Sequence, residues 1–156
     1  QIIMAKPHGD EVLVSAHSRE LTRNYGWKAP GGNLPAAYLT GLLCGLKAKA
    51  QGTKETILDI GLHSPSKGSR IFAVLKGVLD AGISAPHSEE KLSDEKRIEG
   101  DHIAKYAESL ASNPEEYQSK FSKYLEQKLP PEDLSRHFAK VKKGIIAAFK
   151  VRGKKA

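Results

Sequence analysis

Residues 61–82 read GLHSPSKGSRIFAVLKGVLDAG and join a β-like segment to an amphipathic helix. The apolar run that leads into them, Glu55 to Leu62, is typical of a strand buried on both faces of a parallel sheet. Cations and hydroxyl groups then gather from His63 to Arg70, where the helix begins. Free backbone N–H groups and the positive end of a helix dipole favour an anion at such a junction. The stretch therefore predicts an anion site at a strand-to-helix turn.

Two segments extend the pattern toward the N-terminus. β-prone runs at 2–5 and 12–16 flank a turn-rich quartet and predict a hairpin. Asn33, followed by Pro35, marks the start of a helix. The order strand, helix, strand, helix predicts an α/β fold with a small mixed sheet and packed helices. Three strands make a thin sheet for two helices, so a further strand is expected before Gln1.

The faces of the two helices follow from their periodicity. The first repeats small residues every four positions, at Ala37, Gly41 and Gly45, which lets another backbone come close. One face of the second is apolar and comprises Ile71, Val74, Leu75, Val78 and Leu79. Its opposite face comprises Ser69, Ala73, Lys76 and Asp80. The pattern is that of an amphipathic helix, which ends at Gly82.

The C-terminal third is predicted to be helical over 102–111, 114–129 and 131–152. The last helix has one apolar stripe, which comprises Leu134, Phe138, Val141, Ile145 and Phe149. Its opposite face is basic and comprises Arg136, Lys140, Lys143 and Lys150. We divide the chain into an α/β core (1–88), which holds the predicted anion site, an acidic connector loop (89–101) and a helical, basic C-terminal extension (102–156).

The positive charge is concentrated near the C-terminus. The formal net charge is +7, and residues 118–156 hold 11 Lys and Arg against 3 Asp and Glu, which leaves 14 against 15 for the rest. Clustered cations favour a polyanionic partner, with nucleic acid commoner than membrane, although solubility alone is the alternative. The sequence shows no membrane span, and the single Cys44 fits a buried thiol in the reducing cytoplasm.

Enzymatic motifs match only in part. The Lys67 loop follows a strand-like run as a P-loop does, but its Lys-Gly-Ser order and glycine spacing are wrong for that motif. Asp59 and Asp80 could form a carboxylate pair, although we expect Asp59 to accept hydrogen bonds from loop N–H groups. No histidine pair has metal-ligand spacing, so neither a metal nor a cofactor is predicted. Trp27 could stack on a base, but a place in the core is favoured.

A family resemblance covers nearly the whole chain. Its motifs, in order, are SAHSREL, YGWK, NLPAAYLTGLL, DIGLHSPSKGSRIFAVLKGVLDAG, PHS, GDHIAKYAESL, FSKYL and PPEDL. Together they resemble the archaeal and eukaryotic form of the large-subunit ribosomal protein that binds 5S rRNA, universal family eighteen. Members of that family carry a basic N-terminal extension and a strand before the position of Gln1. The resemblance implies a ribonuclease-H-like α/β core without that fold's catalytic carboxylates.

The resemblance also implies a role and a set of contacts. The role is that of a non-enzymatic constituent of the cytoplasmic ribosome, which attaches 5S rRNA to large-subunit rRNA in the central protuberance. The implied partners are these two RNAs and neighbouring ribosomal proteins, including another 5S-binding protein. RNA contacts are expected at His17, Ser18, Arg19, Lys28, His63, Lys67, Gly68, Ser69, Arg70, His87 and Arg97. An enzyme that handles phosphate or nucleotides through the Lys67 loop is the alternative.

Overall fold

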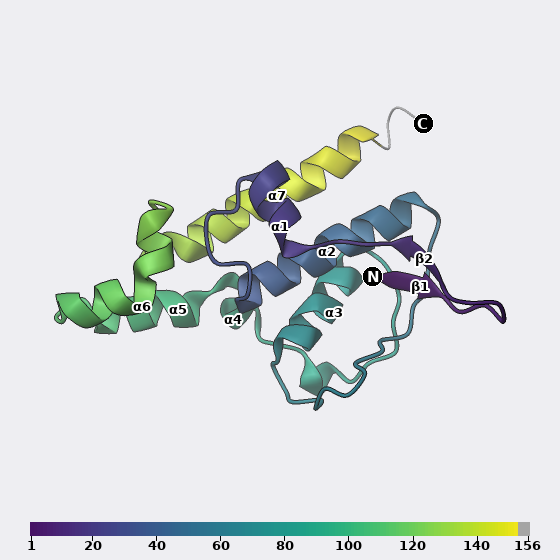
Figure 1. Cartoon of the computed structure of the whole chain (residues 1–156), viewed down its shortest axis with the longest axis horizontal. Helices are drawn as coiled ribbons and strands as arrows, with labels where there is room; N and C mark the ends of the chain where they lie inside the picture. The colour runs from purple at the N-terminus through teal and green to yellow at the C-terminus, as the bar shows by residue number, and fades with distance from the viewer. Residues whose placement is uncertain (153–156) are drawn as a thin grey trace.

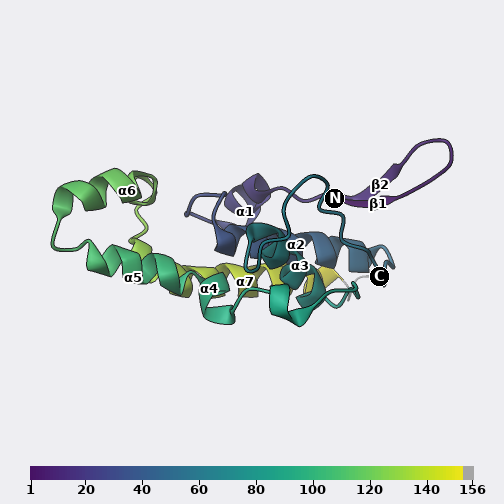
Figure 2. The same cartoon turned by 90° about the horizontal axis from the view of Figure 1, so that it is seen from below.

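A computed structural model describes residues 1–152, with side chains through residue 150. The strands are β1 (Ile2–Met4) and β2 (Glu11–Val14). The helices are α1 (Ser18–Tyr25), α2 (Leu34–Ala50), α3 (Arg70–Asp80), α4 (Glu95–Glu99), α5 (Asp101–Ser109), α6 (Pro114–Glu126) and α7 (Leu134–Arg152). Two 3-10 turns, η1 (Glu89–Lys91) and η2 (Pro131–Asp133), complete the order. The β-hairpin and the α5–α6 pair project from opposite ends of the body (Figures 1 and 2). The fold is thus mixed α/β, as predicted.

Helices α2 and α3 lie side by side (Figure 1) and form the most extensive contact between elements in the described part of the chain. Glycines allow their close approach. A Cβ added at Gly41 would lie 2.8 Å from the carbonyl carbon of Val74 and closer still to its oxygen. A Cβ at Gly77, on the facing helix, would lie 2.6 Å from the backbone nitrogen of Leu42. The two backbones therefore touch where neither has a side chain, as the repeat of small residues at Ala37, Gly41 and Gly45 predicted.

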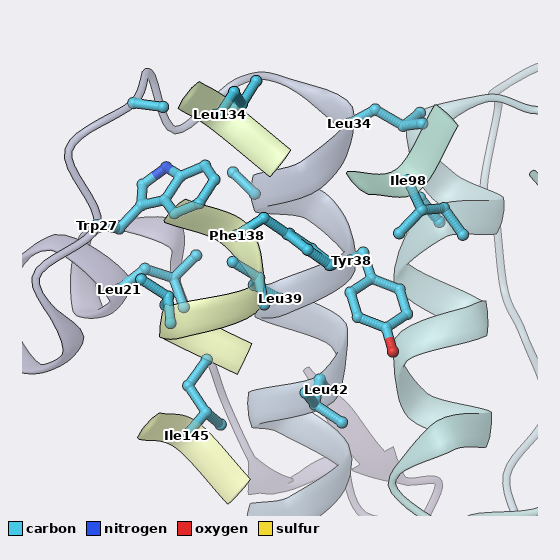
Figure 3. Close-up of a cluster of buried hydrophobic side chains, with 14 of the residues drawn as sticks. Leu21, Trp27, Leu34, Tyr38, Leu39, Leu42, Ile98, Leu134, Phe138 and Ile145 are labelled. Atoms are coloured by element: carbon cyan, nitrogen blue, oxygen red, sulfur yellow. The ribbon is translucent and has the colours of Figure 1, made fainter. Parts of the chain in front are cut away.

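The main core lies where α7 meets α2 and the loop after α1 (Figure 3). Its largest fully buried side chains include Leu21, Trp27, Tyr38, Leu39, Leu134, Phe138 and Ile145. The apolar stripe predicted for the last helix is buried from Leu134 to Ile145, and the basic residues opposite are exposed. Trp27 is only 1% exposed, which confirms its place in the core. One hydrophobic cluster thus joins the N-terminal segment to the C-terminal helices.

Tyr38 ties three helices together. Its hydroxyl donates to Asp80 Oδ2 at the end of α3 at 2.5 Å, and the Lys142 ammonium of α7 lies 4.8 Å from its ring centroid. Burial, and then the Asp80 carboxylate, raise the pKa of this phenol far above its ordinary value. Asp80 also pairs with Lys76 at 3.1 Å. Asp80 therefore has a structural role. In the described part of the chain, no cluster of His, Cys, Asp or Glu could hold a metal ion.

The prediction of a strand from Glu55 to Leu62 is wrong. The sheet has two strands, β1 and β2, paired antiparallel, and the predicted strand reaches only one isolated parallel bridge, between Glu55 and Ser84. Ile57 and Leu62 are fully or nearly fully exposed, at 87% and 107%. An apolar run becomes a buried strand only where neighbouring strands pair with its backbone, and here no such ladder forms. Asp59, also exposed, accepts a hydrogen bond from Gly61 N–H at 2.8 Å, as expected.

Two finer predictions also change. Ala73, assigned to the polar face of α3, is completely buried, because α3 packs on α2 along one side and on a second small cluster along the other. The connector at 89–101, expected to be a loop without periodicity, contains η1 and α4. Ile98 of α4 is 4% exposed and joins the main core. A five-residue helix with one core anchor is too short to show periodicity in sequence.

Asn33 provides a stability test of the start of α2. Its Oδ1 accepts from Ala36 N–H at 2.8 Å, and its Nδ2 donates to the Tyr124 hydroxyl of α6 at 3.2 Å. Asn33→Ala removes both bonds, and we expect a loss of about 1–2 kcal/mol in the free energy of unfolding, measured in urea. Asn33→Ser keeps an acceptor for the helix cap, so its free energy of unfolding should fall by only about a few tenths of a kcal/mol. Equal losses in the two variants would contradict the capping role.

Candidate nucleic-acid interface

A groove of about 570 Å³ opens at the N-terminal end of α3. Three segments that are distant in sequence form its walls, namely 16–18, 31–40 and 63–74. Five of the predicted contact residues line it: His17, Ser18, His63, Ser69 and Arg70. The structure therefore brings together side chains that the sequence placed up to about fifty residues apart.

His17 is held in place by the start of α1. Its Nδ1 accepts from the backbone N–H of Arg19 at 3.1 Å, while the backbone N–H of His17 donates to Glu20 Oε1 at 2.9 Å, which forms a capping box. Because Nδ1 accepts, the neutral ring carries its proton on Nε2. Glu20 is engaged further by Lys47 at 2.6 Å. The imidazole thus offers an N–H donor from a fixed position at the edge of the groove.

Arg70 connects α3 to the opposite wall. Its Nη1 donates to the carbonyl oxygen of Gly32 at 2.9 Å. A guanidinium has five N–H donors, so one such bond orients the group and leaves donors for an anion. Arg70 is exposed, and its contact with Gly32 could not be predicted from the sequence because the two residues share no motif. The Gly31–Gly32 segment was missed for the same reason.

The first turn of α3 is free of competing groups. Ser69 occupies the N-cap position but makes no capping hydrogen bond, and its buried Oγ has no partner among the described residues. The turn contains no acidic side chain. Gly68 has φ +69°, a left-handed conformation that favours glycine, and its N–H donates to Lys91 carbonyl oxygen at 3.1 Å. The helix dipole and uncapped N–H groups therefore face the groove without a counter-charge.

Three predicted cations lie outside the groove lining. Lys67 is exposed in the loop beside it, and Arg19 is exposed in the first turn of α1. Lys28 is exposed in the loop after α1, where its backbone N–H donates to His137 Nε2 of α7 at 3.1 Å. These residues can extend a cationic surface from the groove, but they do not shape it.

His87 and Arg97 line a different groove. This one has a volume of about 1040 Å³, and its lining contains charges of both signs, with Lys76, Lys96 and Lys105 as well as Glu89, Glu95 and Asp101. His87 Nδ1 lies 2.7 Å from the Ala85 carbonyl oxygen. Burial, and then Arg97, lower the pKa of His102 in the same groove. His87 and Arg97, which are also predicted RNA contacts, therefore line a different pocket from the groove at the α3 N-terminus.

The three segments that form the first groove lie within the part of the chain that matches a known protein family. A family model described as "Ribosomal large subunit proteins 60S L5, and 50S L18" matches residues 1–55 and 46–88. The chain belongs to this family. The L5/L18 match covers every residue that lines the groove at the α3 N-terminus, whereas Arg97 of the second groove lies beyond it.

Two archaeal relatives extend the likeness past the L5/L18 match. The "Large ribosomal subunit protein uL18" of Aeropyrum pernix is 52% identical over 151 residues, which cover 96% of this chain and 71% of that protein. The protein of the same name from Ignicoccus hospitalis is 51% identical over 152 residues, 97% of this chain and 74% of that protein. The alignments therefore include the C-terminal helices.

These findings confirm the resemblance drawn from the sequence motifs. The chain is a structural component of the large ribosomal subunit and takes part in translation. Ribosomal proteins of this kind are not enzymes, so the alternative of a phosphate-handling enzyme is excluded. Within residues 1–152, no helix has the length and apolar character needed to span a bilayer.

Proposed function

We propose that the chain binds 5S rRNA and helps to attach it to large-subunit rRNA in the central protuberance. One observation carries the proposal: the groove at the α3 N-terminus combines His17, His63 and Arg70 with an uncapped helix start. Backbone N–H groups, a guanidinium and imidazole N–H groups all donate to phosphate oxygens. The groove therefore has the chemistry of an RNA-backbone site.

The binding mechanism follows from the charges. The groove supplies phosphate contacts of fixed geometry, and Arg19, Lys28 and Lys67 add exposed cations around it. Such contacts read the shape of folded RNA with few bonds to base edges, and they release counterions on binding. The affinity should therefore fall steeply as salt rises. His87 and Arg97, in the second groove, belong to a separate contact surface of the same RNA or of a neighbouring one.

The surface outside the groove is available to other partners in the ribosome. We assign to it large-subunit rRNA and neighbouring ribosomal proteins, including another 5S-binding protein. The C-terminal helices have an exposed basic face on α7, which comprises Arg136, Lys140, Lys143 and Lys150. This face contributes long-range attraction to RNA, whereas the groove positions the RNA.

A gel-shift titration with 5S rRNA across a salt series tests the proposal. We expect 5S rRNA to bind more tightly than an unrelated RNA duplex of equal length at every salt concentration. We also expect the logarithm of the binding constant to fall linearly with the logarithm of salt concentration. Equal affinity for the two RNAs would show a non-specific basic protein and would contradict the proposal.

A further inference from the structure

His137 on α7 holds the loop that follows α1, although it lies 109 residues away from it in sequence. Its Nε2 accepts from Lys28 N–H at 3.1 Å, and its imidazole stacks on the indole of Trp27, with ring centroids 5.2 Å apart and planes at 27°. Trp27 lies against the part of α7 that carries Leu134 and Phe138 (Figure 3). The His137 side chain therefore contacts both the indole of Trp27 and the backbone of Lys28, whose own side chain is exposed.

The loop between α1 and α2 is fixed at two further points, by Leu21 near its start and by Arg70 of the candidate RNA site near its end. The backbone N–H of Trp27 donates to the Leu21 carbonyl oxygen at 3.0 Å, and Gly26, in a left-handed conformation, ends α1 between them. Five residues after Trp27, the Gly32 carbonyl accepts from Arg70. The loop thus has one anchor on α7, at Lys28, and one on α3, at Gly32. A change at His137 would remove the contact with α7 that holds the backbone of Lys28.

Only a neutral imidazole can make the contact with Lys28. Nε2 must accept, so the ring proton is on Nδ1, and a second proton on Nε2 would face the Lys28 N–H. The charged groups that act on the ring are Lys28 from the loop and Lys140 from α7, both cations. The adjoining helix α1 contributes Arg19, Arg23 and Glu20, and the Glu20 carboxylate is engaged by Lys47 and His17. Burial, and then Lys28 and Lys140, lower the pKa of His137.

We propose that His137 is a positioning residue for RNA binding, whose neutral imidazole, held out from α7, fixes the backbone that presents Lys28 to RNA. This role rests on the proposed function. It makes the C-terminal helix, which lies outside the L5/L18 match, part of the RNA-binding geometry of the N-terminal segment. His137 itself needs no contact with RNA.

Two substitutions of His137 separate positioning from bulk packing. His137→Leu fills space but has no acceptor, and we expect the affinity for 5S rRNA to fall about fivefold, the effect of one hydrogen bond. His137→Gln retains an acceptor for Lys28 N–H and should bind within about twofold of the original chain. Thermal unfolding of both variants shows that they fold. If His137→Leu bound as tightly as the original chain, the positioning role would be refuted.

A double-mutant cycle with Lys28→Ala tests whether His137 acts through Lys28. Once the Lys28 ammonium is gone, the orientation of its backbone no longer affects RNA, so His137→Leu should cause no further loss of affinity. Losses that simply add would show that His137 acts elsewhere, and they would overturn the inference.

The pH dependence provides a readout that packing alone would not change. The chain has a single tryptophan, so fluorescence of the RNA-free chain reports on Trp27. Because the pKa of His137 is lowered, its protonation is expected only as the pH falls below about 6.5, the ordinary value for histidine. This protonation should change the emission in the original chain and leave it unchanged in His137→Gln. The affinity of the original chain relative to His137→Gln should fall over the same range, since the other histidines gain charge equally in both proteins.

The outcomes distinguish this inference from the proposed function. If the original chain did not prefer 5S rRNA to an unrelated duplex, the proposed function would fail and the positioning role with it, whatever the fluorescence showed. If the chain preferred 5S rRNA but the affinity ratio to His137→Gln did not change with pH, only the positioning role would fail.

Discussion

Gly41→Ala is expected to destabilise the chain by about 3 kcal/mol or more, although it adds a single methyl group. The new Cβ would lie 2.8 Å from the carbonyl carbon and Cα of Val74 and closer still to the Val74 oxygen. Overpacked side chains can adopt other rotamers at a cost of about 1–3 kcal/mol, but two backbones can only move apart. Separating α2 from α3 would also loosen the Tyr38–Asp80 bond between them. Urea unfolding, followed by circular dichroism, measures the loss.

Gly144→Ala is the matched control. Gly144 also lies inside a helix, α7, but a Cβ added there meets nothing within 4 Å. The substitution should stabilise the chain by about 0.5–1 kcal/mol, because alanine has the higher helix propensity. If both substitutions stabilised the chain, the close approach of α2 and α3 would be contradicted.

Combined replacement of Lys67 and Arg70 by alanine is expected to have the largest effect on RNA binding. Each cation that neutralises one phosphate contributes about 0.7–0.9 to the slope of log affinity against log salt. The single variants Lys67→Ala and Arg70→Ala should each reduce the slope by about that amount, and the double variant by nearly twice as much. Both side chains belong to exposed residues, so the fold should be stable to these changes.

Two variants serve as controls for this prediction. Arg70→Lys keeps the charge but loses the planar fork that bridges to Gly32, so it should keep the salt slope while binding more weakly. Lys150→Ala removes one exposed cation from α7 that contributes only long-range attraction, so it should scarcely change the affinity for 5S rRNA. Equal reductions for Lys67, Arg70 and Lys150 would refute the special role of the groove.

The sequence predicted the parts of the molecule that depend on local rules. Asn33 with Pro35 indicated the start of α2, and the apolar stripe of the last helix indicated which face of α7 is buried. Capping and periodicity act within a few residues, so they can be read along the chain. The motifs also carried the family resemblance, which the comparisons confirmed.

Strand pairing could not be read from the sequence in the same way. The run from Glu55 to Leu62 has the composition of a buried strand, yet the folded chain leaves Ile57 and Leu62 exposed. Whether an apolar run is buried depends on neighbours that hydrogen-bond to its backbone, and composition does not specify those neighbours.

The amino-acid sequence by itself determined the hairpin, the family and the helices α2, α3, α5, α6 and α7, but not α1 or α4. It also predicts the anion-binding chemistry of the Lys67 loop. The tertiary structure decided which of these residues meet. It placed His17, His63 and Arg70 in one groove and His87 and Arg97 in another. It also paired Gly41 with α3 and joined His137 to Lys28. The physical reason is the same in each case, because contacts between distant segments depend on how packed faces align in space, which no local pattern encodes.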